Sequence, residues 1–315
     1  MEAAVRRTLA RTLVVVLGAA LGLAPVASAA DLATKAAELA SKLRARVQAV
    51  DTHLDGVLGV YVEDLSSGSL VELRADELFP TASSIKLAVL YELYRQADEG
   101  RIDLAEVTRP PLPRVAGTGV LQYLGDQVSL TWRDLALLML RWSDNEAANL
   151  LIRRVGRAAI NHRLDALLLG KTRLRREMMD LAAARRGDEN VSTPRELARL
   201  AAILARGEGM SAGRAQDLLA VATVAAEDSP FRRGLPEGVR AISKPGTLEG
   251  VRCETAWVDV PGRPYIAAIM TAYVQQESDG EEAITELSAA IYATFDRLAR
   301  ASDYGRLIRD KDAGK

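Results

Sequence analysis

The chain is poor in the residues that form disulfides and most metal sites. Its 315 residues include one cysteine, Cys253, and two histidines, His53 and His162. A single cysteine excludes an internal disulfide, so the fold depends on its packed core, and we predict that Cys253 is a small buried residue. Two isolated histidines do not have the spacing of a zinc site, and we expect neither a metal nor a cofactor.

The chain also lacks an excess of charge of either sign. Its 41 basic and 42 acidic residues leave a net charge of −1. This balance gives no electrostatic reason to expect binding to nucleic acid or to an anionic membrane surface. We therefore expect neither of these partners.

The N-terminal apolar run is too short for a retained membrane span. Residues 13–23 follow three arginines and precede the small-residue sequence Ala27-Ser28-Ala29, a pattern typical of a cleavable secretion signal. We predict a signal peptide at residues 1–29 and a periplasmic or secreted protein without a stable membrane anchor. About 285 residues remain after cleavage, enough for one large domain or two closely associated ones. We predict one domain, residues 30–315.

The hydrophobic pattern predicts strands on both sides of a long helical region. Strands are expected at residues 58–65, 70–78, 241–244, 254–260 and 265–274. Helices are expected at residues 32–50, 195–205 and 281–300 and over much of 83–209, with breaks at 110–113 and 117–119 and a loop at about 170–193. This order predicts an α+β fold with three layers, α/β/α, in which terminal helices cover one antiparallel sheet and a helical lobe is inserted at about 84–235.

The candidate chemistry begins at Ser83 and Lys86, at the predicted start of a helix. Serine is a poor nucleophile at neutral pH and needs a base to take its proton. Residues i and i+3 share a helix face, and a helix N-terminus favours developing negative charge. A motif this short also occurs by chance, so a solvated first helical turn is the alternative explanation for the pair taken alone.

Two further motifs follow at intervals compatible with one site. Ser143-Asp144-Asn145 comes about sixty residues after Ser83, at the end of an apolar helix. Its hydroxyl and amide can face one cleft, although an ordinary helix N-cap is the alternative. The segment Ser243-Lys244-Pro245-Gly246-Thr247 ends a predicted strand, where a plain strand-end lysine before a turn is the alternative.

Together and in this order, the Ser-x-x-Lys, Ser-Asp-Asn and Lys-Pro-Gly motifs resemble those of the class A β-lactamase family of penicillin-recognising serine enzymes. The resemblance covers nearly the whole chain after the predicted signal. It implies the β-lactamase and D,D-peptidase type of fold and a small-molecule substrate, a β-lactam or a group like the peptidoglycan stem. We expect a monomer.

The resemblance implies a catalytic or binding role for each matching residue. Ser83 would be the acylated nucleophile, and Lys86 would accept its proton. Ser143 would pass a proton to the leaving β-lactam nitrogen. Asn145 would hydrogen-bond the amide of the substrate's acyl side chain.

The resemblance also implies how the rest of the substrate is held. Lys244 would lie beside Ser143 and help to bind the substrate carboxylate. The backbone N–H groups of Ser83 and Thr247 would form the oxyanion hole. Arg252 matches the place where the family often has a carboxylate-binding arginine, with a plain surface arginine as the alternative.

Hydrolysis also requires a group that releases the acyl-enzyme. The family uses a glutamate on an Ω-shaped loop to activate water. Counting back from Thr193-Pro194, Glu177 falls at this position and Arg175 matches the arginine of the loop. The alternative is that Glu177 is an ordinary loop carboxylate.

Three positions depart from the family pattern. Leu181 stands where an asparagine helps to hold the water, and Asn190 stands where an aspartate closes the loop, although Asp188 and Glu189 are adjacent. Pro245 replaces a hydroxyl residue and removes a strand N–H; an edge strand tolerates proline, and Thr247 could supply the hydroxyl.

The sequence therefore predicts an exported serine β-lactamase that hydrolyses the β-lactam amide through an acyl-enzyme at Ser83. The three departures keep two alternatives open: a D-alanyl-D-alanine peptidase or esterase-like relative, and a penicillin-binding protein that is acylated without efficient turnover. The segment at 209–213 also fits the Gly-x-Ser-x-Gly elbow of α/β-hydrolases, but a helix precedes it and no histidine follows. We predict a loop there.

Overall fold

The computed structural model describes residues 29–223, 228–302 and 304–308. The predicted signal peptide lies outside the described residues except for Ala29, which begins helix α1 (Ala29–His53). Among the residues that are described, no helix is long and apolar enough to cross a membrane.

The centre of the described chain is an antiparallel sheet of five strands in the order β2-β1-β9-β8-β7. These strands are β1 (Val57–Asp64), β2 (Gly68–Leu73), β7 (Ala241–Leu248), β8 (Val251–Val258) and β9 (Tyr265–Ala272). Every residue of β8 and β9 is buried, because helices cover both faces of the sheet. Strand β7 is at one edge, pairing with β8 alone within the sheet.

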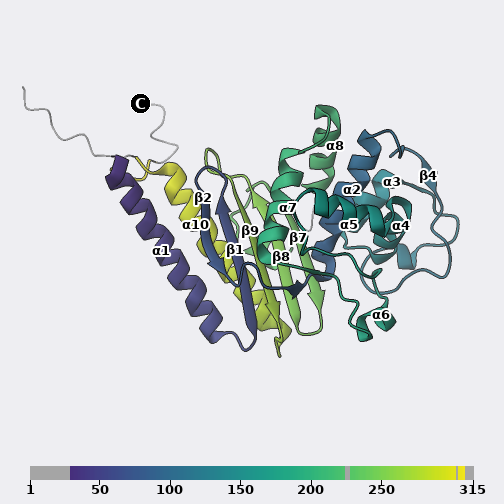
Figure 1. Ribbon diagram of the computed structural model, residues 1–315, viewed down its shortest axis with the longest axis horizontal. Helices are drawn as coiled ribbons and strands as arrows, with labels where there is room; N and C mark the ends of the chain where they lie inside the picture. Colours follow the sequence, from purple (N-terminus) through teal and green to yellow (C-terminus); the bar gives the residue numbers. More distant parts are fainter. Residues whose placement is uncertain (1–28, 224–227, 303, 309–315) are drawn as a thin grey trace, which may run out of the picture.

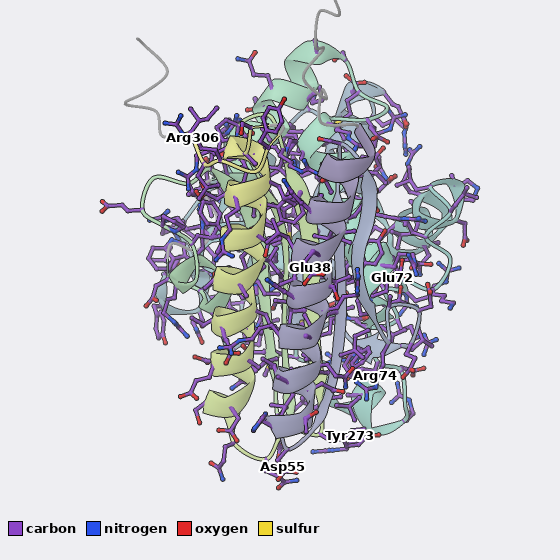
Figure 2. The ribbon with its side chains drawn as sticks, turned by 90° about the vertical axis from the view of Figure 1, so that its left-hand side faces the viewer. Glu38, Asp55, Glu72, Arg74, Tyr273 and Arg306 are labelled. Carbon is purple, nitrogen blue, oxygen red and sulfur yellow. The ribbon has the colours of Figure 1, made fainter. Side chains whose placement is uncertain are left out.

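Two long helices cover one face of the sheet. Helices α1 and α10 (Glu277–Arg300) lie side by side against it (Figures 1 and 2). Their apolar stripes pack against alternate residues of the strands, in a cluster that includes Leu43, Val47 and Ile291. The rings of Tyr265 and Phe295 stack there with centroids 4.3 Å apart.

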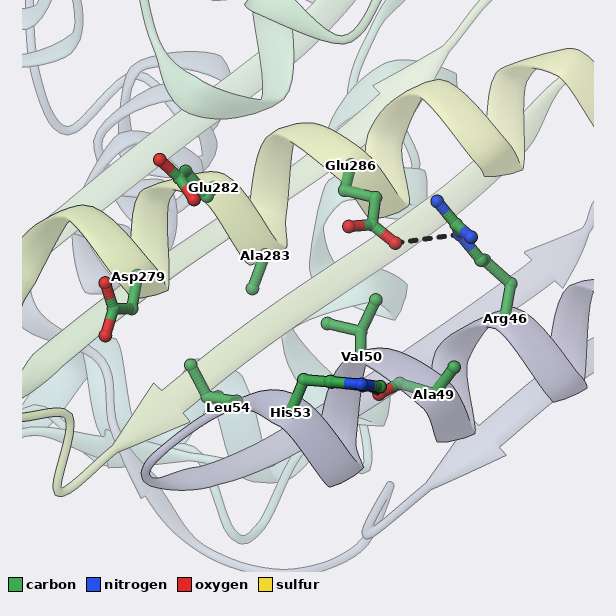
Figure 3. A pocket seen from close by; sticks show the side chains of 9 residues that line it. All are labelled: Arg46, Ala49, Val50, His53, Leu54, Asp279, Glu282, Ala283 and Glu286. Carbon is green, nitrogen blue, oxygen red and sulfur yellow. Dashed lines mark hydrogen bonds and ion pairs between the residues drawn. The ribbon is translucent and has the colours of Figure 1, made fainter.

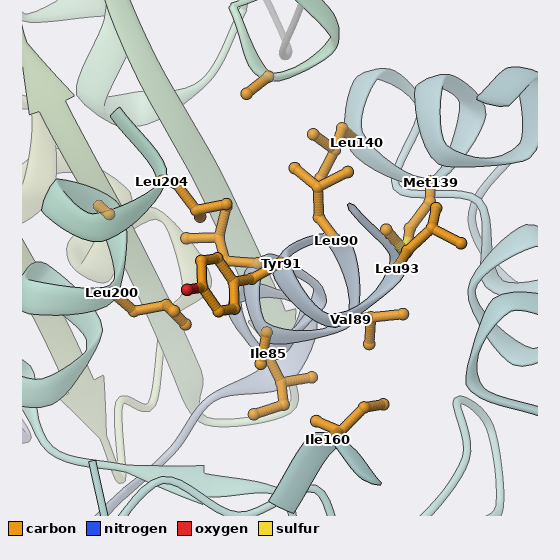
Figure 4. Packing of buried hydrophobic residues seen from close by; sticks show 14 of the residues in the cluster. Ile85, Val89, Leu90, Tyr91, Leu93, Met139, Leu140, Ile160, Leu200 and Leu204 are labelled. Atoms are coloured by element: carbon orange, nitrogen blue, oxygen red, sulfur yellow. The ribbon is translucent and has the colours of Figure 1, made fainter. Parts of the chain in front are cut away.

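The opposite face carries α7 (Pro194–Arg206) and, beyond it, the helical lobe (Figure 1). The lobe is centred on α2 (Lys86–Asp98), which is buried along most of its length. Figure 4 shows Val89, Leu90 and Leu93 of α2 among side chains from several neighbouring helices. The lobe is built from α3 (Trp132–Arg141), α4 (Asn145–Val155), α5 (Arg157–Ala166), α6 (Leu181–Arg185) and α8 (Ala212–Ala222).

Short elements complete the described chain. They are β3 (Phe79–Pro80), η1 (Ala82–Ile85), β4 (Val107–Thr108), η2 (Leu121–Tyr123), β5 (Leu130–Thr131), β6 (Val191–Ser192) and α9 (Pro230–Arg233). One of these matters for the site described below, because η1 leads directly into α2. Helix α9 packs beside β7 and β8 on the face that α10 covers.

The α+β prediction is confirmed, whereas several predicted boundaries were wrong. The second strand ends at Leu73 rather than at residue 78, because Arg74 has a left-handed φ of 46° that breaks the extended backbone. Strand β7 continues to Leu248, four residues further than predicted, and passes through Pro245. Proline is accommodated because β7 is an edge strand. The predicted loop at 209–213 is a turn up to Ser211, and α8 begins at Ala212.

Candidate active site

Ser83 lies in η1, on the wall of a pocket of about 250 Å³ between the sheet edge and the helical lobe. The residue before it, Ala82, has a φ of 44°. A left-handed conformation costs a non-glycine residue about 1 kcal/mol, and such strain gathers at functional sites. No hydrogen bond to the Ser83 hydroxyl is found within the described residues, so this oxygen is free to meet a ligand in the pocket.

Contacts to the sheet edge hold η1 in this position. The hydroxyl of Ser84 donates to the carbonyl of Lys244 at 2.9 Å, and the thiol of Cys253 donates to the carbonyl of Thr81 at 2.9 Å. Cys253 is buried, as predicted. Gly246 allows this close approach, since a Cβ there would lie 2.5 Å from the Cys253 sulfur. The two adjacent serines therefore have different functions, because Ser84 fastens η1 to β7 while Ser83 faces the pocket.

Two fully buried lysines converge on the hydroxyl of Ser143. Lys86 Nζ donates to Ser143 Oγ at 3.2 Å, and Lys244 Nζ donates to the same oxygen at 3.1 Å. Lys86 also donates to the Ser143 carbonyl at 2.6 Å and to Asn145 Oδ1 at 3.0 Å. The structure thus brings together four of the residues that the three motifs contributed.

Burial alters the protonation of both lysines. It lowers the pKa of Lys86 well below its usual value, and the nearby charge of Lys244 lowers this pKa further. Burial also lowers the pKa of Lys244 to about 8, although Glu254 opposes that effect. A lysine with a strongly lowered pKa can accept a proton at neutral pH, whereas one near 8 keeps much of its charge.

The Ser143-Asp144-Asn145 segment is held in place by its middle residue, Asp144. The Asp144 carboxylate caps α4 by accepting from the N–H of Ala147 at 3.0 Å. It also accepts from the N–H groups of Val120 and Leu121 at 2.7 and 2.8 Å. The N-cap alternative is therefore correct for Asp144, and it leaves Ser143, with a φ of 51°, on the pocket wall beside Asn145.

The remaining pocket wall comes from three places in the chain. Pro245, Thr247 and Leu248 contribute from β7. Gly117 and Thr118 contribute from the segment that the sequence predicted only as a helix break, and the Thr118 hydroxyl donates to the Ser143 carbonyl at 2.8 Å. The third part comes from the loop at 170–193, through Arg176, Met178, Met179, Leu181 and Asn190.

Glu177 is not brought to this pocket. Its carboxylate accepts from Arg153 Nε at 3.0 Å and from Nη2 at 2.5 Å, outside the cleft. The next residue is fixed instead: Met178 N–H donates to Asn149 Oδ1 at 2.7 Å, and Asn149 Nδ2 donates to the Met178 carbonyl at 3.0 Å. Met178 thus faces the pocket and Glu177 faces away, a position that does not support the predicted water-activating role.

The loop closes through a different arginine from the one that the sequence suggested. Arg176, rather than Arg175, pairs with Glu189, with Nη2 2.7 Å from Oε1. Asn190 Oδ1 accepts from the backbone N–H groups of Arg175 and Arg176 at 2.7 and 3.0 Å. An amide and an adjacent carboxylate together replace the loop-closing aspartate.

Arg252 is also outside the pocket. It is buried on the face of the sheet that α10 covers, where it forms ion pairs with Glu277 and, at 3.6 Å, with Glu281. Its guanidinium also donates to the Leu248 carbonyl at 2.9 Å. A Cβ at Gly280 would lie 2.9 Å from its side chain, so α10 packs tightly over it. Neither the predicted carboxylate-binding role nor the surface alternative fits this position.

A second hollow of about 400 Å³ lies between α1 and α10 (Figure 3). Acidic, basic and apolar side chains line it together with His53, and an ion pair of 2.7 Å joins Arg46 to Glu286 across it. None of the three motifs contributes to it. The described residues contain no group of three or more His, Cys, Asp or Glu side chains arranged to hold a metal ion.

Comparison with known proteins identifies the family of the chain. The model of a family described as "Beta-lactamase enzyme family" matches residues 41–295, which include all three motifs. The chain belongs to this β-lactamase family. A β-lactamase of Streptomyces cellulosae is 32% identical over 275 residues, which cover 81% of this chain and 87% of that protein.

Similar solved structures have the same fold. A β-lactamase from Sphaerobacter thermophilus superimposes with a TM-score of 0.74 at 29% identity, covering 81% of this chain and 97% of the other. The protein PBP-A superimposes with a TM-score of 0.73 at 28% identity, covering 81% and 96%. A variant of PBP-A has been solved as an acyl-enzyme complex with penicillin-G. The resemblance to class A β-lactamases is confirmed.

Proposed function

We propose that this family member is an exported serine hydrolase that opens β-lactam rings through a covalent acyl-enzyme at Ser83. The observation that carries the proposal is the convergence of Lys86 and Lys244 on the Ser143 hydroxyl, in the same pocket as the free hydroxyl of Ser83. Such an arrangement holds a nucleophile, a proton acceptor and a proton donor in one cleft.

Acylation follows from these contacts. Ser83 Oγ attacks the β-lactam carbonyl carbon while its proton passes to neutral Lys86, and the backbone N–H groups of Ser83 and Thr247 stabilise the oxyanion. The C–N bond then breaks, and the nitrogen takes a proton from the Ser143 hydroxyl. Lys86 replaces that proton through its contact with Ser143 Oγ. The charge on Lys244 attracts the substrate carboxylate, with Thr247 nearby on the same wall.

A penicillin-binding protein that is acylated with slow turnover is the second candidate, and one observation favours it. The deacylating water needs a base, but the Glu177 carboxylate is bound to Arg153, while Met178 and Leu181 line the pocket. The solved acyl-enzyme of a PBP-A variant shows that this fold can hold such an adduct. A peptidase acting on peptidoglycan-like substrates would use the same acylation machinery.

Mixing the protein with a chromogenic cephalosporin in excess separates the candidates. Sustained hydrolysis over many turnovers supports the β-lactamase. A burst of one equivalent, with a matching mass increase on the intact protein, supports the penicillin-binding alternative. The absence of both burst and adduct contradicts both. Ser83→Ala is the control, and we expect it to give neither signal.

Export has its own test. We propose that residues 1–29 are removed during secretion, on the basis of the N-terminal pattern and the secreted class of enzyme that it fits. The N-terminal sequence of the protein recovered from the periplasm or the medium should begin at Ala30. Recovery of the chain from the cytoplasm with residues 1–29 intact would contradict this proposal.

A further inference from the structure

Thr118 contacts the Ser143-Asp144-Asn145 segment but takes no part in the acylation steps above. Two hydrogen bonds join it to this segment, one in each direction. The Thr118 hydroxyl donates to the Ser143 carbonyl at 2.8 Å, and the Asn145 N–H donates to the Thr118 carbonyl at 3.1 Å. Thr118 and Ser143 both line the pocket. One threonine therefore contacts the residues on either side of Asp144, including the proposed proton donor.

The segment around Thr118 is held by contacts of its own. Gln122 Nε2 donates to the Gly117 carbonyl at 2.6 Å and to the Gly119 carbonyl at 3.0 Å. The backbone at Gly119 comes so close to Asp144 that a Cβ there would lie 2.3 Å from the carboxylate. The Thr118 hydroxyl is therefore presented to Ser143 from a backbone that is fixed on both sides.

The backbone of Ser143 needs such support. Its φ of 51° is left-handed, a conformation that a residue other than glycine keeps only where its surroundings compensate for the strain. The Ser143 carbonyl accepts from two donors, Lys86 Nζ at 2.6 Å and the Thr118 hydroxyl. The Ser143 hydroxyl must stay within reach of Lys86 and Lys244 to relay a proton. Rotation of this backbone toward an ordinary φ would displace the hydroxyl from both lysines.

We propose that Thr118 is a positioning residue for proton delivery. By holding the Ser143 carbonyl, it keeps the Ser143 hydroxyl where that group can protonate the leaving β-lactam nitrogen. Thr118 itself neither gives nor takes the transferred proton. This inference rests on the proposed acylation of Ser83. The structural alternative is that the Thr118 hydroxyl only stabilises the fold of the two segments.

The two explanations differ in how a substitution at Thr118 depends on the leaving group of the substrate. An amine nitrogen must be protonated to leave, so acylation by a β-lactam requires Ser143. A thiol is much more acidic, with a pKa of about 8.5 for cysteine. When Ser83 attacks a thioester, the C–S bond breaks, the oxyanion returns to a carbonyl, and the sulfur leaves as a thiolate without a proton from Ser143. Lys86 takes the Ser83 proton in both reactions.

The test compares benzylpenicillin with a phenylacetylglycyl thioester of mercaptoacetic acid. Both compounds carry a phenylacetamido side chain and a carboxylate, and they differ in the leaving group. Thr118→Val replaces the hydroxyl by a methyl group of similar size. We expect it to lower the second-order rate of acylation by benzylpenicillin about tenfold, and to leave the rate with the thioester within about twofold. The mass of the intact protein follows the first reaction, and the release of free thiol follows the second.

Four further variants serve as controls. Thr118→Ser keeps the hydroxyl and should restore the penicillin rate. Thr118→Ala also removes the hydroxyl and serves if Thr118→Val does not fold. Ser143→Ala should slow the penicillin reaction with the same selectivity but more strongly. Thr52→Val removes another exposed threonine hydroxyl, one that donates to the Gln48 carbonyl in α1 at 2.8 Å, and should leave both rates unchanged.

Each result supports or contradicts the inference. A selective loss of the penicillin rate in Thr118→Val, with recovery in Thr118→Ser, supports it. An equal loss with both substrates, an unchanged penicillin rate, or a Thr118→Ser protein without recovery overturns it and leaves Thr118 with a structural role. A Ser143→Ala protein without selectivity contradicts the donor role of Ser143, and the inference with it. Wild-type protein that reacts with neither compound contradicts the proposed function itself.

Discussion

The two walls of the pocket differ in polarity. The wall formed by η1, the Ser143-Asp144-Asn145 segment and β7 is rich in polar groups, and Ser84, Lys86 and Lys244 each donate to a partner on another element. The wall formed by the loop at 170–193 presents Met178, Met179 and Leu181, while the Glu177 carboxylate is bound to Arg153 outside the pocket. The proposed acylation uses the first wall, whereas the second wall carries the departures that bear on deacylation.

The largest effect should come from removing the nucleophile on the polar wall. Ser83→Ala deletes the proposed nucleophile, so we expect labelling by a fluorescent penicillin to fall by at least about 10⁴-fold. Ser84→Ala is the matched control, because its hydroxyl bonds to the Lys244 carbonyl rather than facing the pocket. Persistent labelling of Ser83→Ala would place the nucleophile elsewhere.

A second change on the polar wall tests its charge. Lys244→Ala removes the cation next to Ser143, and we expect the acylation rate at pH 7 to fall by about 10²-fold. The wild-type rate should decline above pH 8, because Lys244 loses its proton as the pH passes its pKa of about 8. Stopped-flow labelling across pH measures both. An alkaline limb that persists in Lys244→Ala would assign the titration to another group.

The apolar wall can be tested by supplying the missing carboxylate. Met178→Glu directs an acidic group into the pocket, and we expect release of the acyl group to accelerate by about 10²-fold, the typical contribution of a general base. Met178→Gln, with the same shape but no charge, is the control. Decay of the adduct mass on the intact protein follows the release.

Substitution of the adjacent residue, Glu177, should have almost no effect on release of the acyl group. Because Glu177 is bound to Arg153 outside the cleft, Glu177→Gln should change release less than about twofold. If Glu177→Gln instead traps the adduct, the loop must move during catalysis so that Glu177 enters the pocket. That result would erase the contrast between the two walls.

The smallest effect on acylation is expected at Arg252. Its buried guanidinium ties the start of β8 to α10, so Arg252→Gln should lower the free energy of unfolding by about 2 kcal/mol. Acylation should stay within about threefold, since Arg252 does not reach the pocket. Chemical denaturation and penicillin labelling measure the two quantities. A large loss of labelling with unchanged stability would restore the carboxylate-binding role.

The position of a residue could be predicted from the sequence where its contacts are with residues nearby in the chain, and not where they are with distant segments. The spacing of Ser83 and Lys86 placed both residues at the start of the α2 helix, because η1 leads directly into it. The order and hydrophobic pattern of the strands predicted the sheet. The boundary of β7 was missed, since whether proline continues a strand depends on which edge is free, a property of the whole sheet.

Amino-acid sequence alone determined the three motifs and the α+β fold, because helix faces and strand periodicity set which residues share a side. Tertiary structure alone decided the rest. Met178 rather than Glu177 faces the cleft because Asn149 of α4 binds the Met178 backbone. Arg252 lies behind the sheet because pairing with β7 sets its face. The positions of these side chains depend on contacts between segments far apart in the chain, which a local sequence pattern does not specify.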